Sequence, residues 1–137
     1  MDRANKPPSP VAAPPLVAVV DDDESVRESL PSLVKEFGFE VQAFASAREF
    51  LDSGRVTETS CLLLDVAMPG MSGPELQQEL ARRGRHIPIV FITGDGDEDV
   101  RPRLMEQGAV ECLFKPFSEA ELLATVSMAL RSRPAGT

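Results

Sequence analysis

The chain has 137 residues, of which 42% are hydrophobic and 26% charged, and its formal net charge at pH 7 is −8. This length suits one domain, and the negative charge argues against direct binding of nucleic acids or anionic membranes. No segment is long enough to span a bilayer or resembles a secretory signal, and the two cysteines lie in separate apolar segments. We therefore expect a cytoplasmic protein without a disulfide framework.

Short apolar segments alternate with amphipathic ones along most of the chain. Residues 1–15 contain five prolines and are expected to form a disordered tail, and residues 133–137 a C-terminal tail or linker stub. The predicted strands are 16–20, 40–44, 61–64, 87–92 and 110–114. The predicted helices are 24–37, 46–53, 72–84, 99–107 and 118–132.

Local signals support these helices. Capping boxes are predicted at Ser46 with Glu49 and at Ser118 with Glu121, because in each pair the glutamate follows the serine by three residues. Apolar residues at helical spacing predict two buried faces: Val26, Leu30, Leu33, Val34 and Phe37 in the first helix, and Leu122, Leu123, Val126 and Leu130 in the last. Pro31 is expected to kink the first helix, and Pro102 is tolerable if the fourth helix starts late.

Five strand–helix repeats predict an α/β fold. Right-handed crossovers place helices on both faces of a parallel sheet. We expect residues 16–132 to form a single (βα)5 flavodoxin-like domain of three layers, with strand order 2-1-3-4-5.

Three of the predicted strands are followed immediately by charged residues. Asp21, Asp22 and Asp23 follow the first strand, Asp65 the third and Lys115 the fifth. The carboxyl ends of parallel strands meet at one edge, so these side chains should converge. Close carboxylates repel each other by about 1–4 kcal/mol per pair. A hard divalent cation would relieve that repulsion, and all-oxygen ligands favour Mg²⁺, Mn²⁺ or Ca²⁺ over zinc.

The same edge suits phosphoryl transfer. Asp65 is the natural nucleophile, since carboxylates accept phosphoryl groups as acyl phosphates. Lys115 and the hydroxyl of Thr93, at the end of the fourth strand, are expected to hold further phosphoryl oxygens.

Over about residues 16–131 the chain resembles receiver domains of bacterial two-component response regulators. The segments 92–97 and 115–117 look most like the FixJ type. The resemblance implies that Asp21, Asp22, Asp65 and the backbone carbonyl of Ala67 bind Mg²⁺, or Mn²⁺ in its place. It also implies a cis peptide between Lys115 and Pro116.

The resemblance also implies a signalling role without enzymatic activity beyond its own phosphorylation and dephosphorylation. A histidine kinase or phosphotransfer protein would phosphorylate Asp65, and Thr93 and Lys115 would act as the switch. The face made by the fourth helix, fifth strand and fifth helix would then bind a partner or a second copy. Side chains at Ala67 and Asp95 are expected to tune the lifetime of the acyl phosphate.

Cys112 departs from the family pattern, because this position usually carries a phenylalanine or tyrosine that moves inward on activation. Movement of the backbone and the fourth helix is expected instead, with weak or altered switching as the alternative. For the function as a whole, the alternative is a pseudo-receiver that does not turn over phosphate. An aspartate-nucleophile phosphatase is disfavoured, since such enzymes typically carry an acid at the position of Ala67. Asp23 is interpreted as a helix N-cap, with metal binding as the alternative, and His86 as a solvated turn residue.

Overall fold

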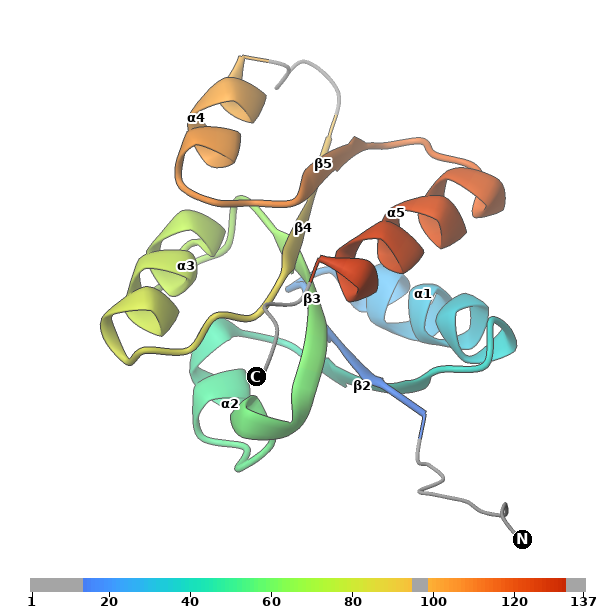
Figure 1. Cartoon of the computed structure of the whole chain (residues 1–137), viewed down its shortest axis with the longest axis horizontal. Helices are drawn as coiled ribbons and strands as arrows, with labels where there is room; N and C mark the ends of the chain where they lie inside the picture. The colour runs from blue at the N-terminus through green and yellow to red at the C-terminus, as the bar shows by residue number, and fades with distance from the viewer. Residues whose placement is uncertain (1–13, 95–98, 133–137) are drawn as a thin grey trace, which may run out of the picture.

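The computed structural model describes residues 14–94 and 99–132. Their parallel strands form one five-stranded sheet in the order β2-β1-β3-β4-β5 (Figure 1). The strands are β1 (Leu16–Val20), β2 (Glu40–Phe44), β3 (Thr59–Asp65), β4 (Ile89–Thr93) and β5 (Glu111–Phe114). The helices are α1 (Glu24–Glu36), α2 (Ala47–Leu51), η1 (Val56–Glu58), α3 (Gly73–Arg82), α4 (Val100–Glu106) and α5 (Glu119–Arg131). The predicted flavodoxin-like fold and strand order are confirmed.

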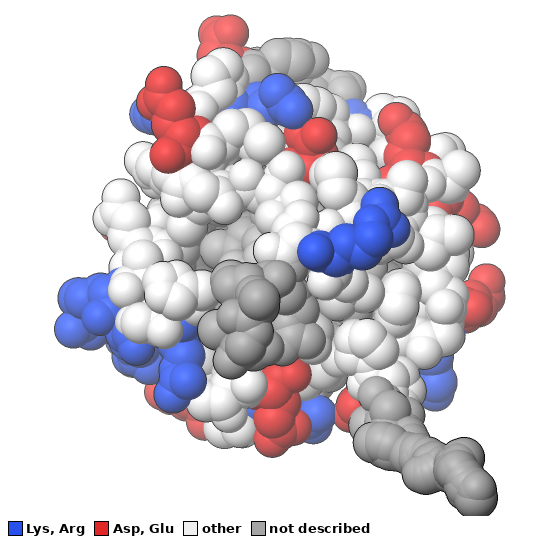
Figure 2. Space-filling view, in the orientation of Figure 1, with Lys and Arg blue, Asp and Glu red and all other residues white. Residues whose placement is uncertain are grey.

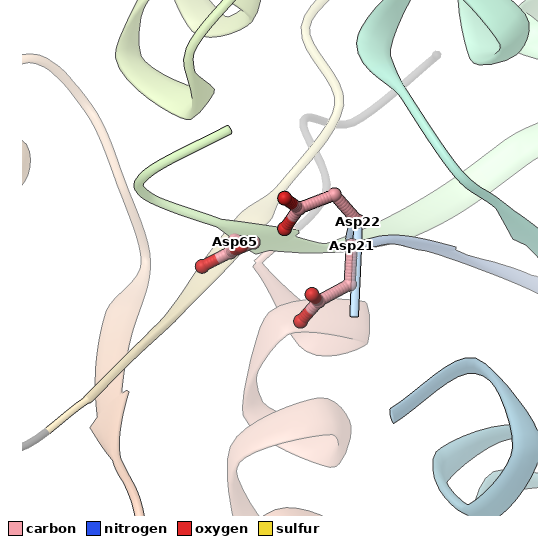
Figure 3. Close-up of side chains that lie close together, drawn as sticks. All are labelled: Asp21, Asp22 and Asp65. Carbon is pink, nitrogen blue, oxygen red and sulfur yellow. The ribbon is translucent and has the colours of Figure 1, made fainter. Parts of the chain in front are cut away.

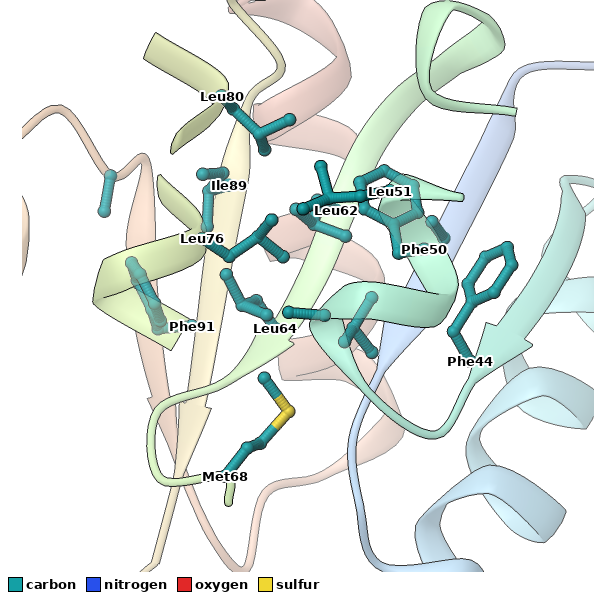
Figure 4. Close-up of a cluster of buried hydrophobic side chains, with 14 of the residues drawn as sticks. Phe44, Phe50, Leu51, Leu62, Leu64, Met68, Leu76, Leu80, Ile89 and Phe91 are labelled. Carbon is teal, nitrogen blue, oxygen red and sulfur yellow. The ribbon is translucent and has the colours of Figure 1, made fainter. Parts of the chain in front are cut away.

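Helices cover both faces of the sheet, with α1 and α5 on one side and α2, α3 and α4 on the other (Figure 1). The central strand β3 supplies alternate residues to the two cores: Leu62 and Leu64 pack with α2 and α3, whereas Cys61 and Leu63 pack with α1 and α5. Figure 4 shows the first of these clusters. Because β3 is buried on both faces, its residues from Cys61 to Leu64 are apolar without alternation up to Asp65.

Helix caps follow the sequence signals with one correction. The capping box at Ser118 and Glu121 is confirmed, and a second one begins α3 at Ser72. At α2 the box is incomplete: Ser46 Oγ accepts a hydrogen bond from the amide of Glu49 at 3.1 Å, but the Glu49 carboxylate accepts from Ala45 instead of Ser46. The glutamate thus reaches one residue further back along the chain.

The buried face of α5 also differs from the prediction. Leu122 and Val126 are buried as expected, but Leu123 is 39% exposed. The smaller Thr125 and Ala129 complete the buried face, so residue size was a poor guide to direction here. Both α1 and α5 have 13 residues, and none of the helices in the described parts of the chain is long and apolar enough to cross a membrane.

The two prolines in question are accommodated within helices. Pro31 lies inside α1, which continues to Glu36, and Pro102 lies in the first turn of α4. That position in α4 leaves no intrahelical hydrogen bond to lose, as expected for a helix that starts late. The strand β4 begins at Ile89, two residues later than predicted, directly after Pro88.

Candidate functional site

Three carboxylates converge where β1 and β3 end. Asp21 and Asp22 follow β1, and Asp65 is the last residue of β3 (Figure 3). These two strands are parallel neighbours with Val20 opposite Leu64, so the acids that follow them meet at one edge. One oxygen of each carboxylate lies within 4.8 Å of the other two. The predicted convergence of these acids is confirmed.

Backbone contacts hold the loop that carries Asp21. Its amide donates to the carbonyl of Phe44 at 3.1 Å, and its Oδ1 accepts from the amide of Asp23 at 2.9 Å. Asp21 is only 1% exposed, and its Oδ2 is buried without a hydrogen-bond partner in the described structure. A buried carboxylate oxygen beside two other carboxylates fits a site for a hard cation.

Asp23 has a different role from its two neighbours. Its Oδ1 accepts a hydrogen bond from the amide of Ser25 at 2.9 Å and caps the N-terminus of α1. Its carboxylate is not among the three that converge. The interpretation of Asp23 as an N-cap is therefore confirmed.

Burial, and then the charge of neighbouring acids, raises the affinity of Asp65 and Asp21 for protons. The pKa of the Asp65 carboxyl is raised to about 7, first by burial, then by the charge of Asp21 and a hydrogen bond shared with Asp22, while Lys115 opposes the rise. Burial also raises the pKa of Asp21. A bound cation would counter both effects, because it stabilises the charged form of each carboxylate.

This raised pKa predicts a pH-dependent stability of the metal-free protein. Unfolded Asp65 loses its proton near pH 3.8, whereas the folded carboxyl keeps it to about pH 7. Between these values the folded state binds more protons, so the unfolding free energy falls as pH rises. The full shift corresponds to about 4 kcal/mol. Because Asp65 is only half-buried, solvent screening reduces this to roughly 2 kcal/mol. Urea unfolding in EDTA should show Asp65→Asn gaining stability relative to wild type from pH 5 to 8. A difference independent of pH would contradict the raised pKa.

Lys115 and Thr93 lie at the same edge of the sheet. The amide of Lys115 donates to the carbonyl of Thr93 at 2.9 Å, which joins the ends of β4 and β5. Thr93 is 3% exposed and follows Ile92, the residue opposite Asp65 in the sheet. Lys115 is close enough for its charge to lower the pKa of both Asp65 and Asp21. The Lys115–Pro116 peptide is cis, as the resemblance implied.

The remaining predicted residues differ in their surroundings. Ala67 is exposed in the loop between β3 and α3, and Asp95 lies outside the described residues. Cys112 is 4% exposed, opposite Phe91 in the sheet, and packs in the core with Phe114. Both cysteines are free thiols, as expected.

Next to Cys112, an ion pair connects α4 to β5. Arg101 Nη2 lies 2.6 Å from Glu111 Oε1, and the same oxygen accepts from the amide of Cys112 at 3.0 Å. Sequence reasoning missed this pair because no local spacing relates a residue on a helix to one on the following strand.

Gly73 is a second feature that sequence reasoning missed. It is the first residue of α3, and its amide donates to the carbonyl of Val66 at 2.9 Å. A Cβ atom at this position would lie 2.3 Å from the carbonyl oxygen of Asp65. The helix can therefore approach the Asp65 strand end only with glycine here.

Among the described residues, no other group of three or more His, Cys, Asp or Glu side chains converges in this way. On the face that Figure 2 shows, basic side chains gather beside the C-terminal end of α3, where Arg82, Arg83 and Arg85 are exposed. Arg82 and Arg83 both pair with Glu79 one turn earlier. His86 is exposed in the segment that follows, which agrees with its interpretation as a solvated residue.

Comparison with known proteins gives consistent matches. A family model described as the response regulator receiver domain matches residues 17–127. Nodulation protein W of Bradyrhizobium diazoefficiens is 54% identical over 111 residues, which cover 81% of this chain and 49% of that protein. The structure of response regulator StyR matches with a TM-score of 0.80 at 50% identity, covering 87% of this chain and 60% of that one. The structure of FixJ-N matches with a TM-score of 0.81 at 33% identity, covering 90% and 99%. The chain spans about half the length of the curated relatives it matches.

Proposed function

Because the chain belongs to the response regulator receiver domain family of two-component systems, with FixJ-like relatives, we propose that it is a phosphoacceptor switch with Asp65 as the phosphorylated residue. The observation that carries this proposal is the meeting of Asp21, Asp22 and Asp65 at one sheet edge, with Thr93 and Lys115 at the ends of the adjoining strands. The presence of all five residues together favours a phosphoacceptor over a pseudo-receiver.

Mg²⁺, or Mn²⁺ in its place, is the proposed cofactor. The carboxylates of Asp21, Asp22 and Asp65 and the backbone carbonyl of Ala67 would hold it. When bound, the cation neutralises the carboxylates and the phosphoryl oxygens that approach them.

The chain's own residues account for the remaining chemistry. A carboxylate oxygen of Asp65 forms the new bond to phosphorus as the bond between phosphorus and the donor's imidazole nitrogen breaks. The electron pair of that bond leaves with the imidazole. The ammonium of Lys115 and the hydroxyl of Thr93 hold two of the remaining phosphoryl oxygens and stabilise their charge.

A sensor histidine kinase or a phosphotransfer protein is the proposed donor, and the cytoplasm the proposed location. The phosphoryl group carries about 1.5–2 negative charges at pH 7. Because the Asp65 carboxylate loses its own charge on forming the acyl phosphate, the net gain at the sheet edge is about one negative charge or less. Contacts of the phosphoryl group with Thr93 and Lys115 then bias the face of α4, β5 and α5, which binds a partner or a second copy. Cys112 is too small to act as the usual mobile aromatic, so the Arg101–Glu111 pair beside it is the proposed link between α4 and β5.

The side chains at positions 67 and 95 are proposed to set the lifetime of the acyl phosphate. Ala67 and Asp95 follow Asp65 and Thr93 by two residues each. Exchanging both should change the rate of phosphate release.

We further propose that the domain comprises residues 16–132, a range that contains the family match at 17–127.

Intact-protein mass spectrometry tests the proposed function. Incubation with a small-molecule phosphodonor and Mg²⁺ should add one phosphoryl group, and EDTA added beforehand should prevent it. If no adduct forms, titration with beryllofluoride, a stable phosphoryl mimic, separates the two explanations. Binding of the mimic would support an acyl phosphate that is too short-lived to detect. Failure to bind beryllofluoride as well would contradict a phosphoacceptor.

A further inference from the structure

We propose that Arg27 is a positioning residue for the cation site, an inference that rests on the proposed function. Arg27 lies in the first turn of α1 and is half-buried. Its Nη1 donates a hydrogen bond to the backbone carbonyl of Asp21 at 2.9 Å. The arginine side chain thus contacts the backbone of the acidic loop and not a carboxylate of that loop.

The hydrogen-bond acceptor of Arg27 is a backbone carbonyl, although several carboxylates lie nearby in the sequence. Arg27 follows a run of four acidic residues, 21–24, and arginine ordinarily forms bidentate pairs with carboxylates. Within the described residues, the guanidinium makes no ion pair with any of them, and its hydrogen bond goes to the Asp21 carbonyl. The carboxylates of Asp21 and Asp22 are left to face Asp65.

The bonded carbonyl belongs to the peptide that joins Asp21 to Asp22, so Arg27 restrains the orientation of that peptide plane. The preceding peptide is restrained separately, because the amide of Asp21 donates to the carbonyl of Phe44 in β2. Both peptides that flank Asp21 are thereby anchored, one to the sheet and one to α1.

Asp22 depends most on this anchor. Its side chain is exposed, and its carboxyl contacts Asp65, whose charge repels it. With the peptide plane held by Arg27, the chain leaves Asp21 in a direction that keeps the Asp22 carboxylate within 4.8 Å of the other two. Without the guanidinium, repulsion among three carboxylates would favour rotation of this peptide and separation of Asp22.

The test measures cation binding directly. Mn²⁺ titration followed by the electron paramagnetic resonance of the free ion gives a dissociation constant for wild type, Arg27→Gln and Arg27→Lys. We expect Arg27→Gln to raise that constant about tenfold, as loss of residues that orient metal ligands commonly does. Arg27→Lys, which keeps a cationic donor, should recover part of the affinity. Lys35→Gln, which removes a charge from the exposed last turn of the same helix, should bind Mn²⁺ within about twofold of wild type.

A second readout separates positioning from a role in folding. At rising Mg²⁺, the concentration needed for half-maximal phosphorylation of Arg27→Gln should increase about tenfold. Its rate at saturating Mg²⁺ should recover to near that of wild type. The proposal would be overturned if Arg27→Gln melted at a lower temperature than wild type in EDTA but bound Mn²⁺ with wild-type affinity. It would also be overturned if Arg27→Lys and Arg27→Gln both bound Mn²⁺ with wild-type affinity.

The outcomes also distinguish this inference from the proposed function. If wild type binds Mn²⁺ but accepts no phosphoryl group or mimic, the phosphoacceptor role fails while the Mn²⁺ titration still tests Arg27. If wild type is phosphorylated and Arg27→Gln has unchanged Mn²⁺ affinity, only the role of Arg27 is rejected.

Discussion

Asp65→Asn is expected to abolish the phosphoryl adduct, with a rate of phosphorylation at least about a hundredfold below wild type. Asparagine keeps the size and shape of the side chain, but its neutral amide is a poor nucleophile and cannot form an acyl phosphate. The variant should fold, because it removes one of three mutually repelling carboxylates whose protonation the folded state already favours. Intact mass after incubation with phosphodonor and Mg²⁺ reads the result.

The matched control is Asp52→Asn, the same chemical change at an exposed residue directly after α2. It should be phosphorylated at the wild-type rate. An adduct that persists in Asp65→Asn would show that another residue accepts the phosphoryl group. Asp21 and Asp22 would then be the first positions to map.

Gly73→Ala is expected to destabilise the fold by about 3 kcal/mol, since overpacking against rigid atoms has effects of this size. The added Cβ would lie 2.3 Å from the carbonyl oxygen of Asp65, 3.0 Å from the ring of Phe91 and 3.1 Å from Cα of Val66. Two of these three atoms are backbone, so the start of α3 must move away from β3. Urea unfolding followed by circular dichroism measures the loss.

The same displacement should also slow phosphorylation in the molecules that remain folded, because the overlapping carbonyl belongs to Asp65, the proposed phosphoacceptor. Gly94→Ala is the matched control for stability. A Cβ at Gly94 meets no atom within 4 Å, and this glycine is not in the left-handed region. If both alanine variants were equally stable, the close approach of α3 to Asp65 would not be what requires glycine at position 73.

Local sequence patterns predicted the elements well because the interactions that form them are local. Apolar runs identified the strands other than β2, which carries Glu40 and Gln42. The Ser118–Glu121 spacing identified the cap of α5 before any tertiary contact was considered. The errors occurred where neighbours distant in sequence decide the outcome. Leu123 is exposed because Thr125 and Ala129 fill the face that meets the sheet, which the hydrophobicity of single residues does not reveal.

The candidate site was predictable for a related reason. Topology alone brings residues at the carboxyl ends of β1, β3 and β5 to one edge, so Asp21, Asp65 and Lys115 could be grouped from strand order and position. Residue type then indicated a hard cation and a phosphoryl group. Asp23 could be separated from its neighbours because N-capping is a local interaction.

The supporting contacts could be found only in three dimensions. Arg27 follows acidic residues that any local rule would pair with it, yet its guanidinium reaches the Asp21 carbonyl. Gly73 has no local turn signal, and its need for glycine comes from the distance between a helix start and a strand end. The order of elements and the chemistry at their ends were therefore determined by the sequence itself, because hydrophobic period, capping and parallel topology act locally or by simple rules. The contacts that hold those ends in place were decided by tertiary packing, because they depend on distances between segments that no spacing along the chain encodes.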